Sequence, residues 1–415
     1  MSSIGWVAFS EKERQRTLDV LSMFNESGAI DEIGIGRIRD AFSDLLFPGT
    51  STIQTRARYF LIVPWIYRAI EHRSPVSDAG HEVWKLETKF IRRLDEAGEE
   101  ADRHGMIGSS AGVDVRQLPS QIYWQGMLKW GIRKQAGPRS LCHRQMSVLE
   151  FTGHHLVDAE EDAQRASSWW DQHLAPEPEG FWDSPTLAMS EDEASYLREA
   201  IAVSVPGTLL AHLALCDHDL SMADGPWDLP PEVQSTLDDR NRDALEKARA
   251  FSIVMNGASV LFNLMLAEKR EEQLDWLDRY ERRGEEWVAQ MEAHADLIAS
   301  VFGDQDGWTS FWAVVRSSNP RVPGIYERAF IENWVGIAAK DPEASLRLPE
   351  ARDLVRTREL RLKGPNRAKL SNAAALEYYQ GGNGALPLDY RWSTVRQLLA
   401  DMGAERSAPE KDAGN

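Results

Sequence analysis

Histidines and carboxylates at helical spacing are the first residues in this sequence that could bind a metal ion. His154 and His155 are followed by Asp158 and Glu161. On a helix His154 and Asp158 lie one turn apart, so they could share a metal. Two further ligands would be needed, and no second cluster has a matching spacing. We therefore interpret this segment as a charged surface helix and predict no metal site.

The two cysteines offer little for nucleophilic chemistry. Cys142 has only the neighbouring His143, and the sequence contains no G-x-S-x-G motif, so a buried, inert thiol is the better interpretation. Cys216 begins the run CDHD, 216–219, whose adjacent side chains point to different helix faces and cannot converge on one ion. We interpret that run as a helix end.

Glycine clusters and paired carboxylates add no specific signal. The clusters at 34–36 and 381–384 lack the lysine and the strand–loop–helix context of a phosphate-binding loop, so we expect turns. Asp40 and Asp44 are one helical turn apart, but such pairs are common in an acidic chain. The sequence therefore identifies no catalytic residue and no cofactor.

Basic residues beside aromatic ones are the remaining candidates. The segment 115–149 contains six cations and no Asp or Glu, interleaved with Tyr123, Trp124 and Trp130, and 352–369 contains seven cations. Arginine can contact phosphate in a bidentate manner and stack on bases. The candidate nucleic-acid or partner-binding residues are Arg37, Arg39, Arg56, Arg58, Arg116, Lys129, Arg133, Lys134, Arg361, Lys363, Arg367 and Lys369. The alternative is that these cations pair with the protein's own carboxylates.

Composition restricts the class of protein. A net charge of −18 over 415 residues argues against a general nucleic-acid coat, because the field of the whole protein repels phosphate. Two cysteines favour a reducing compartment. The N-terminus lacks the basic region of a signal peptide, and the apolar run 251–267 is interrupted by Asn256 and Asn263. We therefore expect a soluble, cytoplasmic protein without membrane contact.

The segment 33–68 contains the densest structural signals. Ile35, Ile38, Phe42, Leu45 and Leu46 form one helical stripe, and Pro48-Gly49 ends that helix. Ser51 and Gln54 predict a capping box that opens a second helix. That helix would carry Arg56 and Arg58 on faces about 160° apart. The run FLIVPWIY, 60–67, is apolar nearly all round, so we expect it to be buried, with Pro64 kinking or restarting the helix.

The other segments also favour helices. We expect them at 10–28, at 83–102 with Trp84, Leu86, Phe90 and Leu94 inward, after Ser190, across 232–302 and at the C-terminus. A helix over SQIYWQGMLKWGIRK, 120–134, would present Lys129 and Arg133 one turn apart. The predicted class is mainly α, multi-helical, with two or three packed lobes and a few short strands. The predicted domains are 1–110, 111–225 and 226–403, followed by a disordered tail at 404–415.

Several stretches together resemble a bacterial family of domains of unknown function. They are IGWVAFS, DEIGIGRIRDAFSDLLFPGTSTIQTRARYFLIVPWIYR, PSQIYWQGMLKWGIR, LDYRW and VRQLLAD, and they span essentially the whole chain. The resemblance implies a soluble protein of about this size, with no known activity, cofactor or catalytic residue. It also implies that the gene for this protein lies beside genes for helicases and phospholipase-D-like nucleases, in clusters suspected of antiphage defence.

Two functional hypotheses follow. The first is a non-catalytic accessory or scaffold subunit of a DNA-handling defence complex, which binds partner proteins, with DNA as a second candidate ligand, through local basic surfaces. The second is an enzyme with an unrecognised site, a nuclease or hydrolase that uses Asp40, Asp44 or the His154–His155 cluster.

Overall fold

Helices make up most of the part of the chain that the structure describes. The computed structural model describes residues 31–71, 73, 76–97, 105–108, 117–148, 169–270, 274–379, 381 and 385–403. These ranges contain 17 α-helices and no strand, and their one β-type pairing is an isolated bridge between Arg133 and Trp170. The mainly α prediction is therefore confirmed. The helix expected at 10–28 and the tail at 404–415 lie outside the described residues.

The helices follow one another in this order: α2 (Gly36–Leu46), α3 (Tyr59–Glu71), α4 (Ala79–Ala97), α6 (Pro119–Lys129), α7 (Arg139–Val148), α9 (Glu191–Ser204), α10 (Leu209–Ala214), α11 (Pro231–Thr236), α12 (Asp239–Ala267), α13 (Leu274–Ala293), α14 (Ala295–Phe302), α15 (Gln305–Ser318), α16 (Ile325–Ala338), α17 (Pro342–Ser345), α18 (Pro349–Lys363), α19 (Ala373–Leu376) and α20 (Trp392–Gly403).

The described residues fall into two compact units. Unit 1 comprises those within Met1–Phe42 and Asp243–Tyr390, and unit 2 comprises those within Ser43–Arg242 and Arg391–Asn415. Each unit thus joins segments that are far apart in the sequence. The three consecutive domains expected from the sequence stay a prediction.

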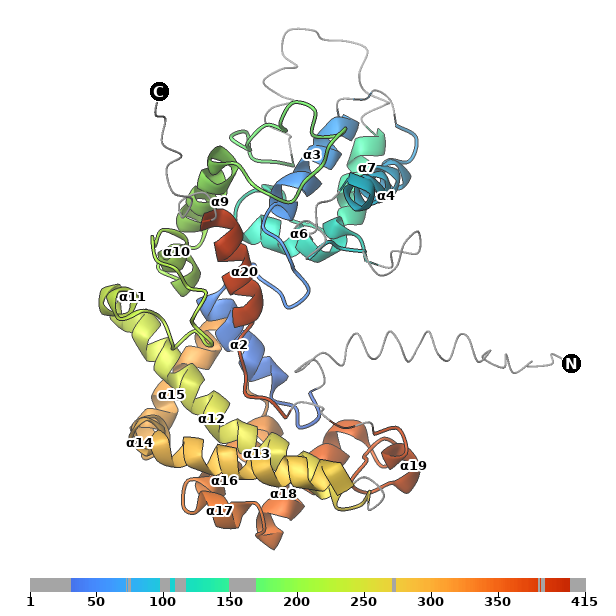
Figure 1. Cartoon of the computed structure of the whole chain (residues 1–415). Coiled ribbons are helices and arrows are strands. Elements are labelled where there is room, and N and C mark those ends of the chain that lie inside the picture. The colour runs from blue at the N-terminus through green and yellow to red at the C-terminus, as the bar shows by residue number, and fades with distance from the viewer. Residues whose placement is uncertain are drawn as a thin grey trace, which may run out of the picture. The chain divides into compact units, whose positions relative to one another are not determined.

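Unit 2 is built around α3. Figure 1 shows this helix beside α4 and α6, and its residues from Tyr59 to Tyr67 are all buried. The Phe60 ring stacks on Trp130 with centroids 3.8 Å apart, and it meets the Tyr123 ring in a T-shaped arrangement with centroids 4.9 Å apart. The prediction that the apolar run forms a core is confirmed, because burial on all sides stabilises a helix that has no polar face.

The start of α3 differs from the prediction. Ser51 and Gln54 do not cap a helix, because α3 begins only at Tyr59. Instead the Gln54 side chain closes a turn: its Oε1 accepts from the Ser51 N–H at 3.0 Å, and its Nε2 donates to the Gly49 carbonyl at 3.1 Å. The helix then continues through Pro64 to Glu71 without restarting.

The outer helix α4 confirms part of its predicted pattern. Phe90 and Leu94 are buried, as expected, and Leu86 is partly buried. Trp84, which we expected to point inward, is 45 % exposed and stacks on His81 with centroids 5.7 Å apart. The prediction for Trp84 is wrong because periodicity cannot separate a residue at the margin of the buried stripe from one at its centre.

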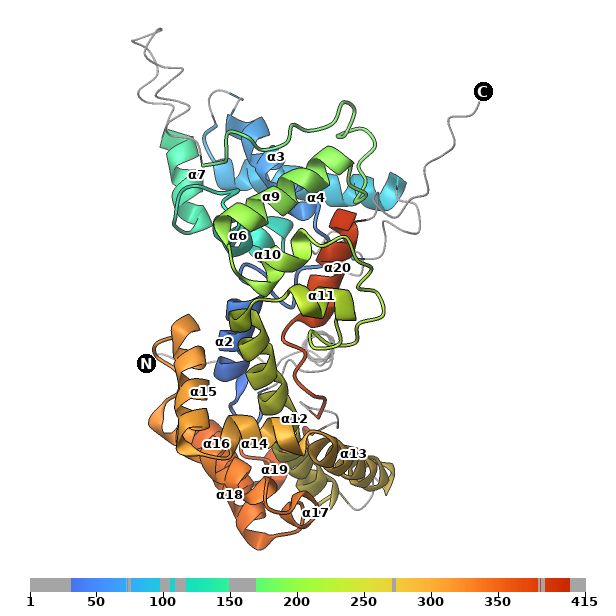
Figure 2. The same ribbon diagram turned by 90° about the vertical axis from the view of Figure 1, so that its left-hand side faces the viewer.

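The helices α9, α10 and α20 form the other part of unit 2 (Figure 2). The predicted capping box is confirmed at α9, where the Ser190 side chain accepts from the Glu193 N–H and Glu193 Oε2 accepts from the Ser190 N–H. The apolar stripe predicted for the last helix is also buried, at Val395, Leu398 and Met402.

In unit 1, α12 supplies the core. The indole N–H groups of Trp287 and Trp334 donate to the carbonyls of Ile253 and Val254, each at 2.8 Å. Gly257 allows this approach, because a Cβ there would lie 2.2 Å from the Trp287 ring. The helix is long and apolar enough to cross a membrane, but 94 % of its most apolar window is buried, which fits the core helix of a soluble protein.

Two helical glycines give a first prediction. A Cβ at Gly126 in α6 would lie 2.5 Å from the Gly49 carbonyl oxygen, whereas a Cβ at Gly336 in α16 would meet nothing within 4 Å. Gly126→Ala should therefore lower the free energy of unfolding by about 1–3 kcal/mol through overpacking. Gly336→Ala should raise it by about 0.5–1 kcal/mol. Urea titration measures both changes, and equal effects at the two sites would contradict the close packing at Gly126.

Candidate nucleic-acid and partner surface

The carboxylates proposed for catalysis are already paired. Asp40 lies 3.0 Å from the guanidinium of Arg39, and Asp44 accepts from Arg391 Nη1 at 2.8 Å. His154, His155, Asp158 and Glu161 lie outside the described residues. Within the described part of the chain, no group of three or more His, Cys, Asp and Glu side chains is placed to hold a metal ion.

The thiols are unsuited to nucleophilic attack. Cys142 is buried, and desolvation strongly raises the pKa of its thiol. Its neighbour His143 instead places Nε2 2.9 Å from the hydroxyl of Tyr67. Cys216 follows the end of α10, as expected, and burial raises the pKa of its thiol as well. These thiols therefore remain protonated at neutral pH.

The run at 216–219 lines a cavity of about 420 Å³ together with α20. Its polar groups are largely used by the protein itself. Arg396 Nη1 donates to the carbonyls of Ser221 and Ala223, and Asp219 accepts from the backbone and the hydroxyl of Ser221. These hydrogen bonds lower the pKa of the exposed Asp219 carboxyl. Arg396 and Asp219 at this cavity are therefore already hydrogen-bonded to the protein itself.

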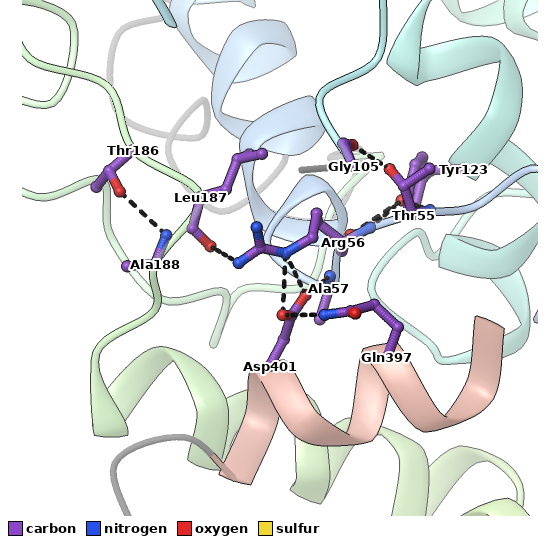
Figure 3. A network of polar contacts seen from close by, with 10 residues as sticks. All are labelled: Thr55, Arg56, Ala57, Gly105, Tyr123, Thr186, Leu187, Ala188, Gln397 and Asp401. Carbon is purple, nitrogen blue, oxygen red and sulfur yellow. Dashed lines mark hydrogen bonds and ion pairs between the residues drawn. The ribbon is translucent and has the colours of Figure 1, made fainter. Parts of the chain in front are cut away.

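Arg56 is occupied within unit 2 (Figure 3). Its Nε donates to both carboxylate oxygens of Asp401 in α20, at 2.9 and 3.0 Å, and Asp401 also accepts from the Ala57 N–H at 2.7 Å. Burial raises the pKa of Asp401, and the contacts with Arg56 and Ala57 oppose that rise. On the other side of the turn, the Tyr123 hydroxyl accepts from the Thr55 N–H at 2.8 Å and donates to the Arg56 carbonyl.

Arg58 is more deeply buried still. Its Nη2 donates to Glu193 Oε1 at 2.7 Å, and its Nη1 donates to the Thr186 carbonyl at 2.9 Å. The guanidinium carbon also lies 5.1 Å from the centroid of the Phe181 ring. The arginine-rich turn before α3 therefore packs both of its guanidinium groups inside unit 2.

Lys129 and Arg133 do not share a helix face, which corrects the sequence prediction. Helix α6 ends at Lys129, and Arg133 lies beyond it with only 1 % of its surface exposed. Its guanidinium donates to the carbonyls of Trp124, Gln135 and Gly137 and lies 4.4 Å from the centroid of the Trp124 ring. Burial lowers the pKa of this arginine. Lys129 is exposed and has no ion pair with a described carboxylate.

This difference gives a second prediction. Arg133→Ala should lower the free energy of unfolding by roughly 1–3 kcal/mol, because it removes a buried guanidinium that packs on Trp124 and donates to the Gln135 and Gly137 carbonyls. Lys129→Ala should change it by less than about 0.5 kcal/mol, as exposed side chains usually do. Urea titration of the two variants measures both effects. Equal stability of the two variants would contradict the structural role of Arg133.

Most cations of the 352–369 run also have internal partners. Lys363 and Lys369 approach Glu32 at 3.5 and 2.5 Å. Arg358 donates to the carbonyls of Ile33 and Gly34, and burial lowers its pKa. Arg367, which is exposed, donates to the Lys363 carbonyl at 3.1 Å. Of the other candidates, Lys134 lies 3.3 Å from Asp171, and Arg116 is outside the described residues.

Arg361 is different. Its guanidinium carbon lies 4.0 Å from the centroid of the Tyr326 ring, both side chains are exposed, and neither is paired with a carboxylate among the described residues. Tyr326 is 62 % exposed and Ile325 is 85 % exposed, at the start of α16. Arg37 borders the same helix end, because its Nη2 donates to the Arg321 carbonyl at 2.7 Å.

We call this feature the arginine–tyrosine surface. It is formed in unit 1 by Ile325, Tyr326 and Arg361, with Arg37, which lies 3.4 Å from Glu327, at its border. Of these, the sequence identified Arg37 and Arg361 and missed the others. Ile325 and Tyr326 follow Pro323-Gly324 at a helix start, where an apolar pair is usually assigned to the buried face. Ile325 lies on the side of α16 opposite the buried Trp334, whereas Tyr326 precedes the buried Phe330 by four residues, so helical spacing alone gives no signal that Tyr326 is exposed.

Within the described ranges the protein is all-helical, and most of the arginines predicted as binding residues form contacts inside its own fold. The chain belongs to a family of unknown function, DUF6361, whose model matches residues 1–405. The resemblance seen in the sequence is confirmed at this level. No curated protein and no solved structure matches the chain.

Proposed function

We propose that this protein is a non-catalytic subunit of a cytoplasmic bacterial DNA-handling complex of the antiphage-defence kind. In this role it contacts nucleic acid through the arginine–tyrosine surface. The observation that carries the proposal is the exposed stack of Arg361 on Tyr326, at 4.0 Å, without a described carboxylate partner. The defence setting rests on the sequence resemblance alone.

The stack has the chemistry that single strands and phosphates require. A guanidinium held over a ring loses less conformational freedom on binding, and its N–H edge remains free to form bidentate contacts with phosphate. The tyrosine ring offers a stacking face for a base. Because the whole chain carries a net charge of −18, such binding would be local and strongly weakened by salt.

The apolar rim supports a role for partner proteins. Ile325 is among the most exposed large apolar side chains in the described part of the chain, and it directly precedes Tyr326 in α16. Tyrosine and arginine are also the residues that most often dominate the energy of protein interfaces. One surface could therefore serve a complex in which a partner covers Ile325 while the arginine edge faces DNA.

The proposal is tested by fluorescence anisotropy with labelled single-stranded and duplex DNA at low salt. Tyr326→Ala combined with Arg361→Ala should weaken single-strand binding by at least tenfold, which corresponds to about 1.4 kcal/mol. Arg279→Ala is the matched control, since Arg279 is an exposed arginine of the same unit that pairs with Asp275 in α13. Equal binding by the wild type and the double variant would refute the proposal.

The enzyme hypothesis, a nuclease or hydrolase, stays a prediction with its own measurement. Incubation of the wild type with labelled DNA and divalent metal ions would reveal turnover if the hypothesis holds. Cleavage that is lost in a His154→Ala, His155→Ala double variant would replace the non-catalytic proposal.

A further inference from the structure

A small pocket in unit 2 has a lining of cations and apolar groups and no carboxylate. It lies between the end of α3, one face of α4 and the loop at 182–185, and its volume is about 210 Å³. Its cations are Arg73, Lys89 and Arg93, and its apolar surface includes Leu86, Phe90 and Trp182. All of the charged residues that line this pocket are cations, although the chain as a whole has 65 acidic and 47 basic residues.

One of the three cations in this pocket contacts the loop at 182–185, and the other two are exposed. Arg93 Nη1 donates to the Trp182 carbonyl and lies 3.3 Å from Asp183, so Arg93 fixes the loop. The Trp182 indole N–H donates to Glu177 at 2.9 Å, which holds the ring in place. Arg73 and Lys89 are exposed, and neither forms an ion pair with a described carboxylate.

Glu82, an acidic residue in the first turn of α4, is already paired with Lys85. Lys85 donates to Glu82 at 2.7 Å, and this hydrogen bond is the main cause that lowers the pKa of the Glu82 carboxyl, with Arg73 as a smaller contributor. Arg73 therefore interacts electrostatically with Glu82 but forms no ion pair with it among the described contacts. Two exposed cations that form no ion pair with a described carboxylate, beside the half-buried Trp182 ring, suit a ligand with two negative charges and a flat apolar group.

We infer that this pocket binds the phosphate monoester and base of a nucleotide. In this arrangement the base lies against the half-buried Trp182 ring, and Arg73 and Lys89 hold the phosphate at the rim. Ligand pockets for drug-sized molecules usually measure about 300–1,000 Å³. A smaller pocket therefore suits one ring, with the sugar and phosphate at its edge. The same chemistry is presented by a free mononucleotide and by the 5′-phosphorylated end of a strand.

The test is isothermal titration calorimetry of the full-length protein with the four ribonucleoside 5′-monophosphates, with adenosine and with ribose 5-phosphate. At least one monophosphate should bind ten or more times tighter than both adenosine and ribose 5-phosphate. The double variant Arg73→Ala, Lys89→Ala should lose that binding by at least tenfold. Arg92→Ala, on the same helix but outside the pocket lining and 70 % exposed at its side chain, is the matched control and should bind as the wild type does.

Further measurements distinguish a free mononucleotide from the 5′-phosphorylated end of a strand as the ligand. A 5′-phosphorylated oligonucleotide that binds better than its 5′-hydroxyl form and the mononucleotides supports a strand end, and the reverse order supports a free nucleotide. Trp182→Phe keeps a ring in place if the loop tolerates no alanine, and it should retain binding. Failure of all four monophosphates and of the phosphorylated oligonucleotide, or equal loss in Arg92→Ala, would overturn the inference. Arg361→Ala should leave this binding unchanged, so its outcome is independent of the arginine–tyrosine surface.

Discussion

Arg58→Ala should lower the free energy of unfolding by about 3–5 kcal/mol, because it leaves the Glu193 carboxylate buried without its cation. Arg58 and Glu193 have side chains only 4 % and 3 % exposed, with the guanidinium nitrogen 2.7 Å from the carboxylate oxygen. Glu193 also caps α9 through the Ser190 N–H, so the lost charge pair and the helix start are coupled. Thermal or urea unfolding measures the loss.

A matched double variant distinguishes the buried charge from the lost packing. In Arg58→Met, Glu193→Gln the methionine fills much of the arginine's space and the amide oxygen can still accept from the Ser190 N–H. This variant should regain a large part of the stability that Arg58→Ala loses, because no buried charge is left unpaired. Unchanged stability in Arg58→Ala would contradict a stabilising role for the buried Arg58–Glu193 pair.

Trp65→Ala should cost about 3–5 kcal/mol, the usual range for removing a large aromatic side chain from a packed core. The Trp65 indole N–H donates to the Ala175 carbonyl at 2.8 Å, and its ring meets the edge of Phe181 with centroids 5.0 Å apart. The variant therefore opens a cavity and also leaves the Ala175 carbonyl without its donor.

The control for Trp65 is Trp84→Ala, which removes the same kind of side chain from an exposed position on α4. Its cost should stay under about 1 kcal/mol. Both variants can be followed by the midpoint of urea unfolding. A Trp65→Ala protein as stable as the wild type would contradict the packing of α3.

Sequence patterns predicted those helical features that depend only on residues close together in the sequence. The Ser190–Glu193 box, the apolar run around Trp65 and the stripe of α20 each depend on neighbouring residues, and all three are confirmed. The false box at Ser51 shows the limit. There Gln54 hydrogen-bonds to the preceding turn. The N–H of Ala57, just before α3, donates to Asp401, which is 344 positions away in the sequence and could not be paired with it from local spacing.

The candidate site was harder to predict because the sequence does not show the partner of each cation. Arg58 and Arg361 are both arginines with aromatic residues nearby, yet one is paired with Glu193 and the other lies exposed on Tyr326. The difference is set by contacts between residues more than thirty positions apart. Charge spacing therefore predicted basic segments, and the fold decided which cations in them are exposed.

The central claim is that Arg361 contacts phosphate. Its most direct test is the salt dependence of single-strand DNA affinity, measured by anisotropy for the wild type and for Arg361→Ala at several salt concentrations. We expect the slope of log affinity against log salt to become shallower by about 0.7 in the variant, the value for one lost phosphate contact on a single strand. The same slope and the same affinity in both proteins would contradict the claim.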